Sequence, residues 1–134
     1  MGSAGYSGTP LAKKLSLKDG LSVWFEAMPE SVRAEIGDLA LDERSGPEKG
    51  IDAAHIFTAE RAVLEARLGA LRTLIAPAGF VWASWPKKAS KIPTDISEDV
   101  IRAVALPMGW VDVKVCAVDA VWSGLKLMIR KDQR

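Results

Sequence analysis

Residues 51–85 read IDAAHIFTAERAVLEARLGALRTLIAPAGFVWASW, and this stretch holds the clearest pattern in the chain. Its two ends, 51–57 and 80–85, are short apolar runs rich in β-forming residues, which predict buried strands. Between them, apolar residues recur at helical spacing from 59 to 76, with Thr58 placed as an N-cap and Gly79 just after the last turn. A strand, a helix and a second strand are typical of a parallel sheet, because parallel neighbours need a crossover between them.

The sequence upstream extends this unit. Its apolar patterns predict a strand at residues 21–28, which ends before Pro29, and a weaker strand at 38–42. Short helices are predicted at 10–17 and 29–36.

Downstream, a helix is predicted from Asp95 or Ser97 to Leu106. Residues 110–118 and 125–130 then alternate apolar and polar side chains, which predicts an antiparallel hairpin. We therefore expect an α/β fold whose mostly parallel sheet has about six strands, an antiparallel last strand, and helices on both faces.

Composition places the chain among ordinary folded proteins, since 49% of its 134 residues are hydrophobic and 26% are charged. We expect a flexible Gly/Ser-rich leader at residues 1–9 and a single domain at 10–134. Lysine and arginine exceed aspartate and glutamate by one, so the net charge argues against nucleic acid as a partner. Neither a signal peptide nor an apolar run long enough for a membrane span is visible, which indicates a cytoplasmic protein with no membrane partner.

The order of helix, Ala-Pro-Ala-Gly turn, strand, helix and two strands resembles the C-terminal half of the Rossmann-like methyltransferases. That resemblance implies a reversed last strand inserted beside residues 80–85. Four literal segments also resemble a family of small bacterial proteins of unknown function: SGTPLAKKL at 7–15, WPKKAS at 85–90, DVKVCAVD at 112–119 and WSGLK at 122–126. This second resemblance implies a bacterial origin and carries no activity.

The turn after the first strand bears on whether a cofactor binds. Binding S-adenosylmethionine or a dinucleotide on such a fold calls for a glycine-rich turn, because only glycine lets the backbone approach the ligand closely. Residues 26–31 read EAMPES and contain no glycine, Pro29 lacks an N–H donor, and Glu30 would repel a phosphate. We therefore expect no cofactor, with S-adenosylmethionine as the alternative.

A lysine-rich loop after residues 80–85 is the best candidate for a ligand site. Open α/β sheets bind ligands beyond the carboxyl ends of their strands. Lys87, Lys88, Ser90 and Lys91 occupy such an end and could hold a phosphate or an acidic partner, with Glu26 facing them from its own strand. The alternative is a solvated turn whose lysine stems pack on Trp85.

Four further residues could carry chemistry or mark an interface. His55 lies in an apolar strand and is expected to be a core histidine with a backbone partner, and the single cysteine, Cys116, is expected to be a quiet thiol unless a nearby cation activates it. One histidine and one cysteine exclude a disulfide and a structural zinc site, so no metal is expected. Trp110 and Trp122 flank the hairpin and could form an exposed aromatic patch, and few helices for two sheet faces favour a homodimer.

Three functions follow from these features. The first is a non-catalytic or regulatory methyltransferase-like domain that binds a partner or a small anionic ligand beyond the strand ends. The alternatives are an S-adenosylmethionine-dependent methyltransferase with an atypical turn, and a nucleic-acid-binding module that uses the lysine loop.

Overall fold

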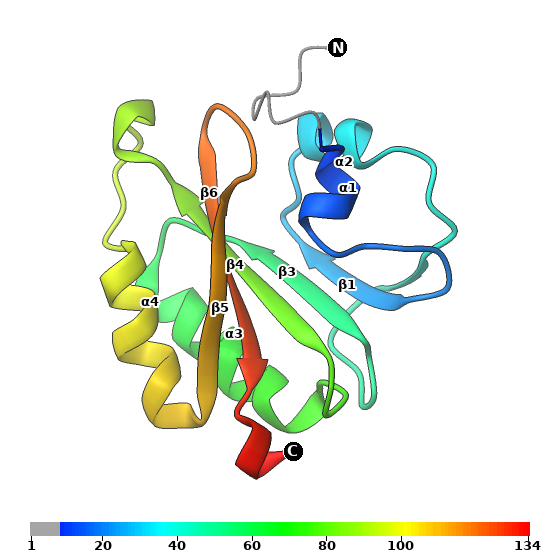
Figure 1. Cartoon of the computed structure of the whole chain (residues 1–134). Helices are drawn as coiled ribbons and strands as arrows, with labels where there is room; N and C mark the ends of the chain where they lie inside the picture. The colour runs from blue at the N-terminus through cyan, green and yellow to red at the C-terminus, as the bar shows by residue number, and fades with distance from the viewer. Residues whose placement is uncertain (1–8) are drawn as a thin grey trace.

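The computed structural model describes residues 9–134, whose six strands form one sheet (Figure 1). The strands are β1 Ser22–Glu26, β2 Asp42–Arg44, β3 Ala53–Phe57, β4 Phe80–Pro86, β5 Trp110–Ala117 and β6 Trp122–Ile129. Their order is β2-β1-β3-β4-β6-β5, with β1 to β4 parallel and β6 antiparallel to both of its neighbours. This confirms the predicted Rossmann-like sheet, with its reversed last strand inserted beside residues 80–85.

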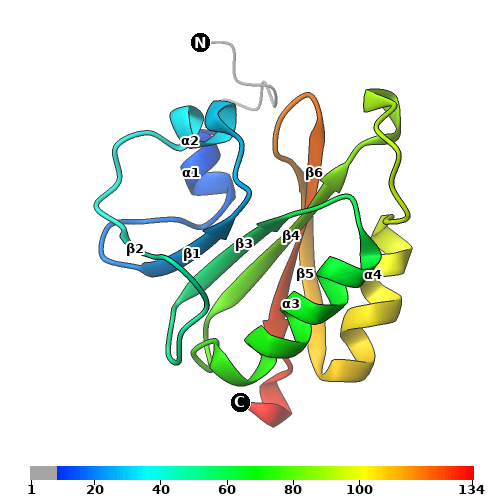
Figure 2. The same ribbon diagram turned by 180° about the vertical axis from the view of Figure 1, so that it is seen from behind.

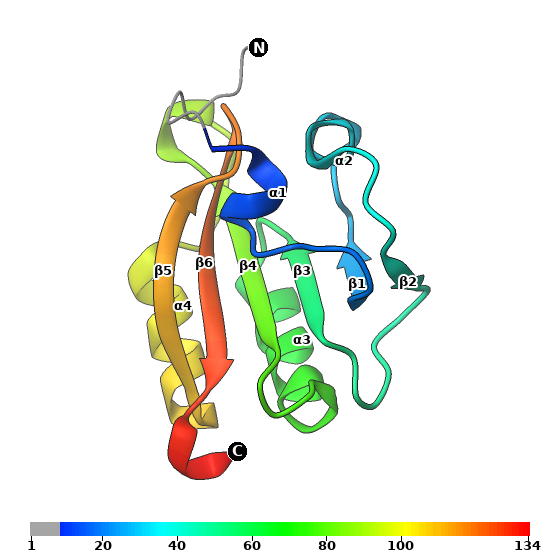
Figure 3. The same ribbon diagram turned by 45° about the vertical axis from the view of Figure 1, so that its right-hand side comes forward.

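Helices cover both faces of the sheet. They are α1 Leu11–Lys14, α2 Glu30–Ile36, α3 Arg61–Leu74 and α4 Glu98–Ala105, with short 3-10 turns at Lys88–Ser90, Leu106–Met108 and Lys131–Gln133. Figure 2 shows α3 and α4 side by side on one face, and Figure 3 shows α1 on the other face. The strand–helix–strand unit predicted from residues 51–85 is thus present, with its helix two residues shorter at each end.

The sheet separates two apolar cores, because side chains alternate between its faces. Trp24 and Val81 pack with Leu64, Leu68 and Leu71 of α3. Their chain neighbours, Val23 and Trp82, point the other way. They pack with residues in and next to α1 and α2, namely Leu11, Leu15, Val32 and Ile36. The continuous apolar runs of β3 and β4 are explained by this burial on both sides.

The weak strand predicted at residues 38–42 is displaced, since β2 begins at Asp42. The backbone of Ala40 is turned toward the loop before β1, where its N–H donates to the Asp19 carboxylate (2.8 Å) and its carbonyl accepts from the N–H of Gly20 (2.8 Å). Pairing with β1 therefore starts only where the N–H of Asp42 donates to the carbonyl of Leu21 (2.9 Å).

Helix capping also differs in part from the sequence rule. Ser97 caps α4 as predicted, and its hydroxyl accepts from the N–H of Val100 (3.2 Å). Thr58 does not cap α3, because its hydroxyl accepts from the N–H of Glu60, which precedes the helix. The carboxylate of Asp95 accepts instead from the N–H of Arg61 (2.7 Å), so the loop after β4 supplies the cap.

Two expectations concern an N-terminal leader and membrane-spanning helices. The expected leader at residues 1–9 lies outside the described residues except for Thr9. Between residues 9 and 134, no helix has both the length and the apolar character that crossing a membrane requires.

Gly79, in the turn from α3 into β4, is predicted to be intolerant of a side chain. A Cβ atom there would lie 2.6 Å from the carbonyl oxygen of Asp52 and 2.9 Å from Cγ1 of Ile75. Gly79→Ala should therefore lower the free energy of unfolding by about 1–3 kcal/mol, as overpacking does elsewhere. Urea denaturation measures this change.

Gly69 provides the matched control, because it is exposed in α3 and a Cβ there meets no atom within 4 Å. Gly69→Ala should raise the free energy of unfolding by about 0.5–1 kcal/mol through helix propensity. Equal effects of the two substitutions would contradict the close approach at Gly79.

Candidate functional site

The topology singles out the carboxyl ends of β1 and β3. These strands are parallel neighbours, yet the chain leaves β1 toward α2 on one face and leaves β3 toward α3 on the other. The two connections diverge at this point, and ligands of open α/β sheets bind at such topological switch points. The first candidates for ligand contacts are therefore the last residue of β1 and the residues of the turn that follows it.

The turn after β1 is made without glycine. Ala27 adopts φ of +57°, the left-handed conformation that usually favours glycine, and Pro29 then precedes the first turn of α2. Holding alanine there costs about 1–2 kcal/mol per residue, and such strained residues cluster at functional sites. The chain therefore makes a tight turn at the place where the sequence rule demands glycine.

An ion pair closes this edge. Glu26 ends β1 on the same face as Trp24, and its carboxylate accepts a hydrogen bond from Nε of Arg67 on α3. The side chains are 22% and 40% exposed, respectively, so both partners reach solvent. The hydrogen bond to Glu26 raises the pKa of Arg67 above its ordinary value, and the pair is a fixed carboxylate beside a fixed guanidinium.

The sequence places Glu26 opposite the lysine loop, but the ion-pair partner of its carboxylate is Arg67 on α3. The position of Glu26 on β1 directs the carboxylate toward α3, where Nε of Arg67 donates a hydrogen bond to it. None of the ion pairs among residues 9–134 involves Lys87, Lys88 or Lys91.

A second ion pair lies beside the first strand pair. Both guanidinium nitrogens of Arg33 on α2 donate to Glu43 on β2, each at 2.9 Å. This hydrogen bonding lowers the pKa of Glu43 below its ordinary value. The neighbouring Asp42 is also in an ion pair, with Arg44 at 2.7 Å.

The lysine loop is divided by the structure. Lys88 lines a pocket of about 360 Å³ with Trp85, Pro86, Thr94, Ile96 and Ser97. Ser90 is engaged within the loop, where its hydroxyl donates to the carbonyl of Lys87 (2.6 Å) and accepts from the N–H of Ile92 (3.2 Å). Lys91 is exposed with φ of +61°, and it does not line this pocket. Of the predicted group, Lys88 is the residue that lines this pocket.

His55 is a core residue, as predicted, but its partner is a side chain. Its Nε2 shares a hydrogen bond of 2.7 Å with the hydroxyl of Ser84, and its ring stacks on Phe57 with centroids 4.2 Å apart. Burial lowers the pKa of His55 to about 3. Although a histidine bonded to a serine resembles a catalytic pair, the two residues are 1% and 2% exposed, so no substrate reaches them.

Cys116 and Asp112 do not share a face of β5, although strict alternation along a strand would place them on the same side. The register of β5 shifts between Asp112 and Lys114, and the carboxylate of Asp112 accepts from Nε of Arg102 on α4 (3.0 Å). Burial raises the pKa of the Cys116 thiol against the opposing pull of nearby lysines, so the described thiol is not activated.

The expected exposed patch of Trp110 and Trp122 is also not formed. Trp110 is fully buried in the core beneath α4, and Trp122 is half-buried on the opposite side, edge-on to Phe57 with ring centroids 5.3 Å apart. The antiparallel register puts Trp110 opposite Ile129 and Trp122 opposite Pro86, at the two ends of β6, which explains why they do not meet.

Comparison with known proteins shows similarity at the level of fold. Neither a family model nor a curated protein matches the sequence. An S-adenosylmethionine-dependent methyltransferase from Aquifex aeolicus is similar with a TM-score of 0.64 and 15% identity, over 89% of each chain. The Methanococcus jannaschii fibrillarin pre-rRNA processing protein scores 0.62 at 8% identity, covering 95% of this chain and 71% of its own. Aeropyrum pernix fibrillarin, in complex with natively bound S-adenosyl-L-methionine, scores 0.61 at 11% identity, with 93% and 71% covered.

These neighbours overturn the expectation that no cofactor is involved. The expectation depended on the missing glycines, whereas the Aquifex aeolicus neighbour is an S-adenosylmethionine-dependent methyltransferase and the Aeropyrum pernix neighbour has S-adenosyl-L-methionine bound. The left-handed Ala27 supplies the physical reason for the error, because the turn does not need a glycine in order to form.

The buried His55 gives a pH-dependent prediction. Its pKa is lower in the folded chain (about 3) than in the unfolded chain (about 6.5), so the unfolded state binds the proton more readily. The stabilisation is therefore complete above pH 6.5, and it decreases by up to about 1.4 kcal/mol for each pH unit below that value. We expect the free energy of unfolding from urea titrations to fall between pH 7.5 and 5.5, while the imidazole NMR signals of the folded protein stay those of the neutral ring. An imidazole that titrates near pH 6.5 would contradict this burial.

Proposed function

We propose that this chain binds S-adenosylmethionine at the carboxyl ends of β1 and β3 and is a methyltransferase-type domain. The observation that carries the proposal is the Glu26–Arg67 ion pair at the topological switch point. The fold likeness supports it, since the matches to methyltransferase folds extend over 89–95% of this chain.

The donor set at this edge fits the cofactor. The amino-acid end of S-adenosylmethionine carries an α-ammonium and an α-carboxylate, and Glu26 and Arg67 present the complementary pair of charges. A carboxylate has about four lone-pair sites and a guanidinium five N–H donors, so both groups keep unused capacity after bonding each other. Glu26 is assigned to the ammonium, and Arg67 to the carboxylate.

Two further groups suit the ribose of S-adenosylmethionine and a second substrate. Glu43 lies on the neighbouring strand β2, and its carboxylate is held in place by the bidentate bond from Arg33, which suits it to accept from hydroxyl groups of a ribose. The pocket beside Lys88 at the end of β4 is the place we assign to the second substrate, and its lysine favours an anionic group there.

When bound, the cofactor supplies an electrophilic methyl group on a positively charged sulfur. Glu26, Arg67 and Glu43 contribute binding and orientation. The described histidine is buried and neutral, so it does not take a proton from a substrate. A regulatory domain would bind the same molecule without consuming it. Chromatography of S-adenosylmethionine incubated with the protein and candidate acceptors distinguishes these two outcomes.

The test of the binding site is isothermal titration calorimetry with S-adenosylmethionine and its demethylated product, S-adenosylhomocysteine. Arg67→Gln and Glu26→Gln should each weaken binding roughly tenfold, since a charge-assisted hydrogen bond contributes about 1.5–3 kcal/mol and these groups are partly exposed. Their thermal unfolding should change little, because partly exposed ion pairs contribute about 0–1 kcal/mol.

Arg61→Gln is the matched control. Arg61 lies on the same helix, and its exposed ion pair, at 3.0 Å, is with Glu65 and not with Glu26. Its substitution should leave binding unchanged. Absence of binding to either compound, or wild-type affinity in Arg67→Gln, would show that the proposed site is wrong.

A further inference from the structure

The face of β5 and β6 turned toward α1 is lined by cations. Leu125, Leu127 and Ile129 of β6 point into the core beneath α3 and α4, so Lys126 and Met128 point the opposite way. The antiparallel register sets Lys114 opposite Lys126 and Val111 opposite Met128 on that same face. Figure 3 shows α1 beside β4 and β6, with β5 beyond it, and Val111 of β5 is exposed on this face.

Lysines from other elements converge on this face. Nζ of Lys14 on α1 donates to the carbonyl of Ala117 (3.2 Å), and Nζ of Lys126 donates to the hydroxyl of Ser16 (2.9 Å). Lys14, Lys87 and Lys114 are close enough to Cys116 to oppose the effect of its burial on its pKa. Burial and the neighbouring Lys114 together lower the pKa of Lys126. Four ammonium groups, from α1, β5, β6 and the segment after β4, thus lie around one stretch of the sheet.

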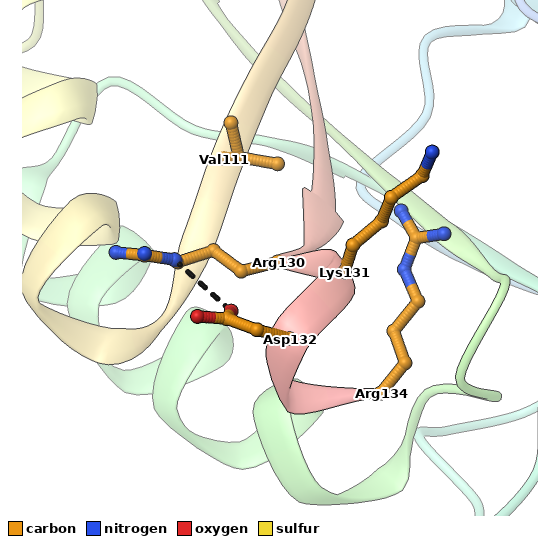
Figure 4. Close-up of a pocket in the computed structure, with 5 residues that line it drawn as sticks. All are labelled: Val111, Arg130, Lys131, Asp132 and Arg134. Carbon is orange, nitrogen blue, oxygen red and sulfur yellow. Dashed lines mark ion pairs between the residues drawn. The ribbon is translucent and has the colours of Figure 1, made fainter.

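The cations continue past the other end of β5. A pocket of about 480 Å³ lies over Val111 and is lined by Arg130, Lys131, Asp132 and Arg134 (Figure 4). Asp132 is paired with Arg130 at 3.4 Å, and Figure 4 shows Lys131 and Arg134 pointing to the opposite side of this pocket from that pair. We name the basic strip by its six residues: Lys14, Lys87, Lys114, Lys126, Lys131 and Arg134.

No carboxylate neutralises the strip within residues 9–134. The described ion pairs all use arginines, and none of them includes a member of the strip. Three acids on these elements have other partners: Asp132 pairs with Arg130, Asp112 pairs with Arg102 on the opposite face, and Asp119 accepts from the N–H groups of Val121 and Trp122. A net charge of +1 therefore hides a local separation of charge.

The dimensions and charge of the strip select its occupant. β5 has eight residues and so spans roughly 26 Å, which exceeds a small metabolite. A second copy packed through the same face would set lysines against lysines, which opposes a symmetric dimer here. Between the cations lie the partly exposed apolar side chains of Val111, Met128 and Trp122, on which unpaired bases can pack.

We propose that the basic strip binds a single-stranded nucleic acid through its phosphates. The strip lies on the β5 and β6 side of the sheet, away from the Glu26–Arg67 pair, so the proposal does not depend on S-adenosylmethionine binding. It reverses the expectation drawn from net charge, because the arrangement of charges and not their sum determines phosphate binding.

The test measures fluorescence anisotropy of a labelled 15-nucleotide RNA of mixed sequence with the full chain, from 50 to 300 mM NaCl. With three to five phosphates neutralised, the slope of log K against log salt should lie between about −2 and −3.5. Lys114→Gln combined with Lys126→Gln removes two of these contacts and should make the slope shallower by about 1.4. Thermal unfolding checks that this variant is folded.

Lys49→Gln combined with Arg61→Gln is the matched control, since it removes the same charge from the loop before β3 and from the start of α3. It should leave the slope unchanged. An equal effect of the two double variants, or binding that does not depend on salt, would overturn the proposal. Tighter binding of poly-L-glutamate than of the RNA would also overturn it and would identify the strip as a surface for acidic proteins.

Discussion

The pairing of β6 between β4 and β5 is the constraint on which the rest of the molecule depends. Residues Val81 to Pro86 of β4 pair in antiparallel fashion with Trp122 to Leu127 of β6, and β6 pairs on its other side with β5. Parallel neighbours need a crossover that covers a sheet face, whereas a hairpin needs none. The connection from β4 to β5 passes through α4 on one face, and the hairpin adds no helix to the other. The exposed part of β5 and β6 that carries the basic strip is thus a consequence of the topology.

Elements set by local pattern were predictable from the sequence. The strands at 53–57 and 80–86, the helix between them and the final hairpin follow from periodicities of apolar residues that burial enforces. The displaced β2 and the cap of α3 were not predictable, because both depend on distant partners. Asp19 turns the backbone at Ala40, and Asp95 reaches Arg61 across 34 residues of sequence.

In the candidate site, too, local patterns were readable from the sequence and distant partners were not. Glu26 was identified as the last residue of its strand, but no pattern in the sequence pairs it with Arg67, which lies 41 residues away on α3. Trp110 reads as a hairpin-flanking aromatic and is fully buried, because its side of β5 faces α4. The glycine rule failed for a different reason. It asks for glycine so that the backbone can turn tightly beside the ligand, and Ala27 makes a left-handed turn there at a cost that the surrounding structure offsets.

The two proposed sites are linked by the order of the strands. The switch point lies between β1 and β3, and β4 is the next strand before β6, so two strand spacings of about 4.8 Å separate β3 from β6. The upper end of the basic strip, at Lys87, follows β4 directly and lies next to Lys88 and its pocket. If both proposals hold, a nucleic-acid strand lying along β5 and β6 would end beside the pocket at the carboxyl edge. The arrangement would then bring a polyanion and a methyl donor to the same edge, with the lysine loop between them.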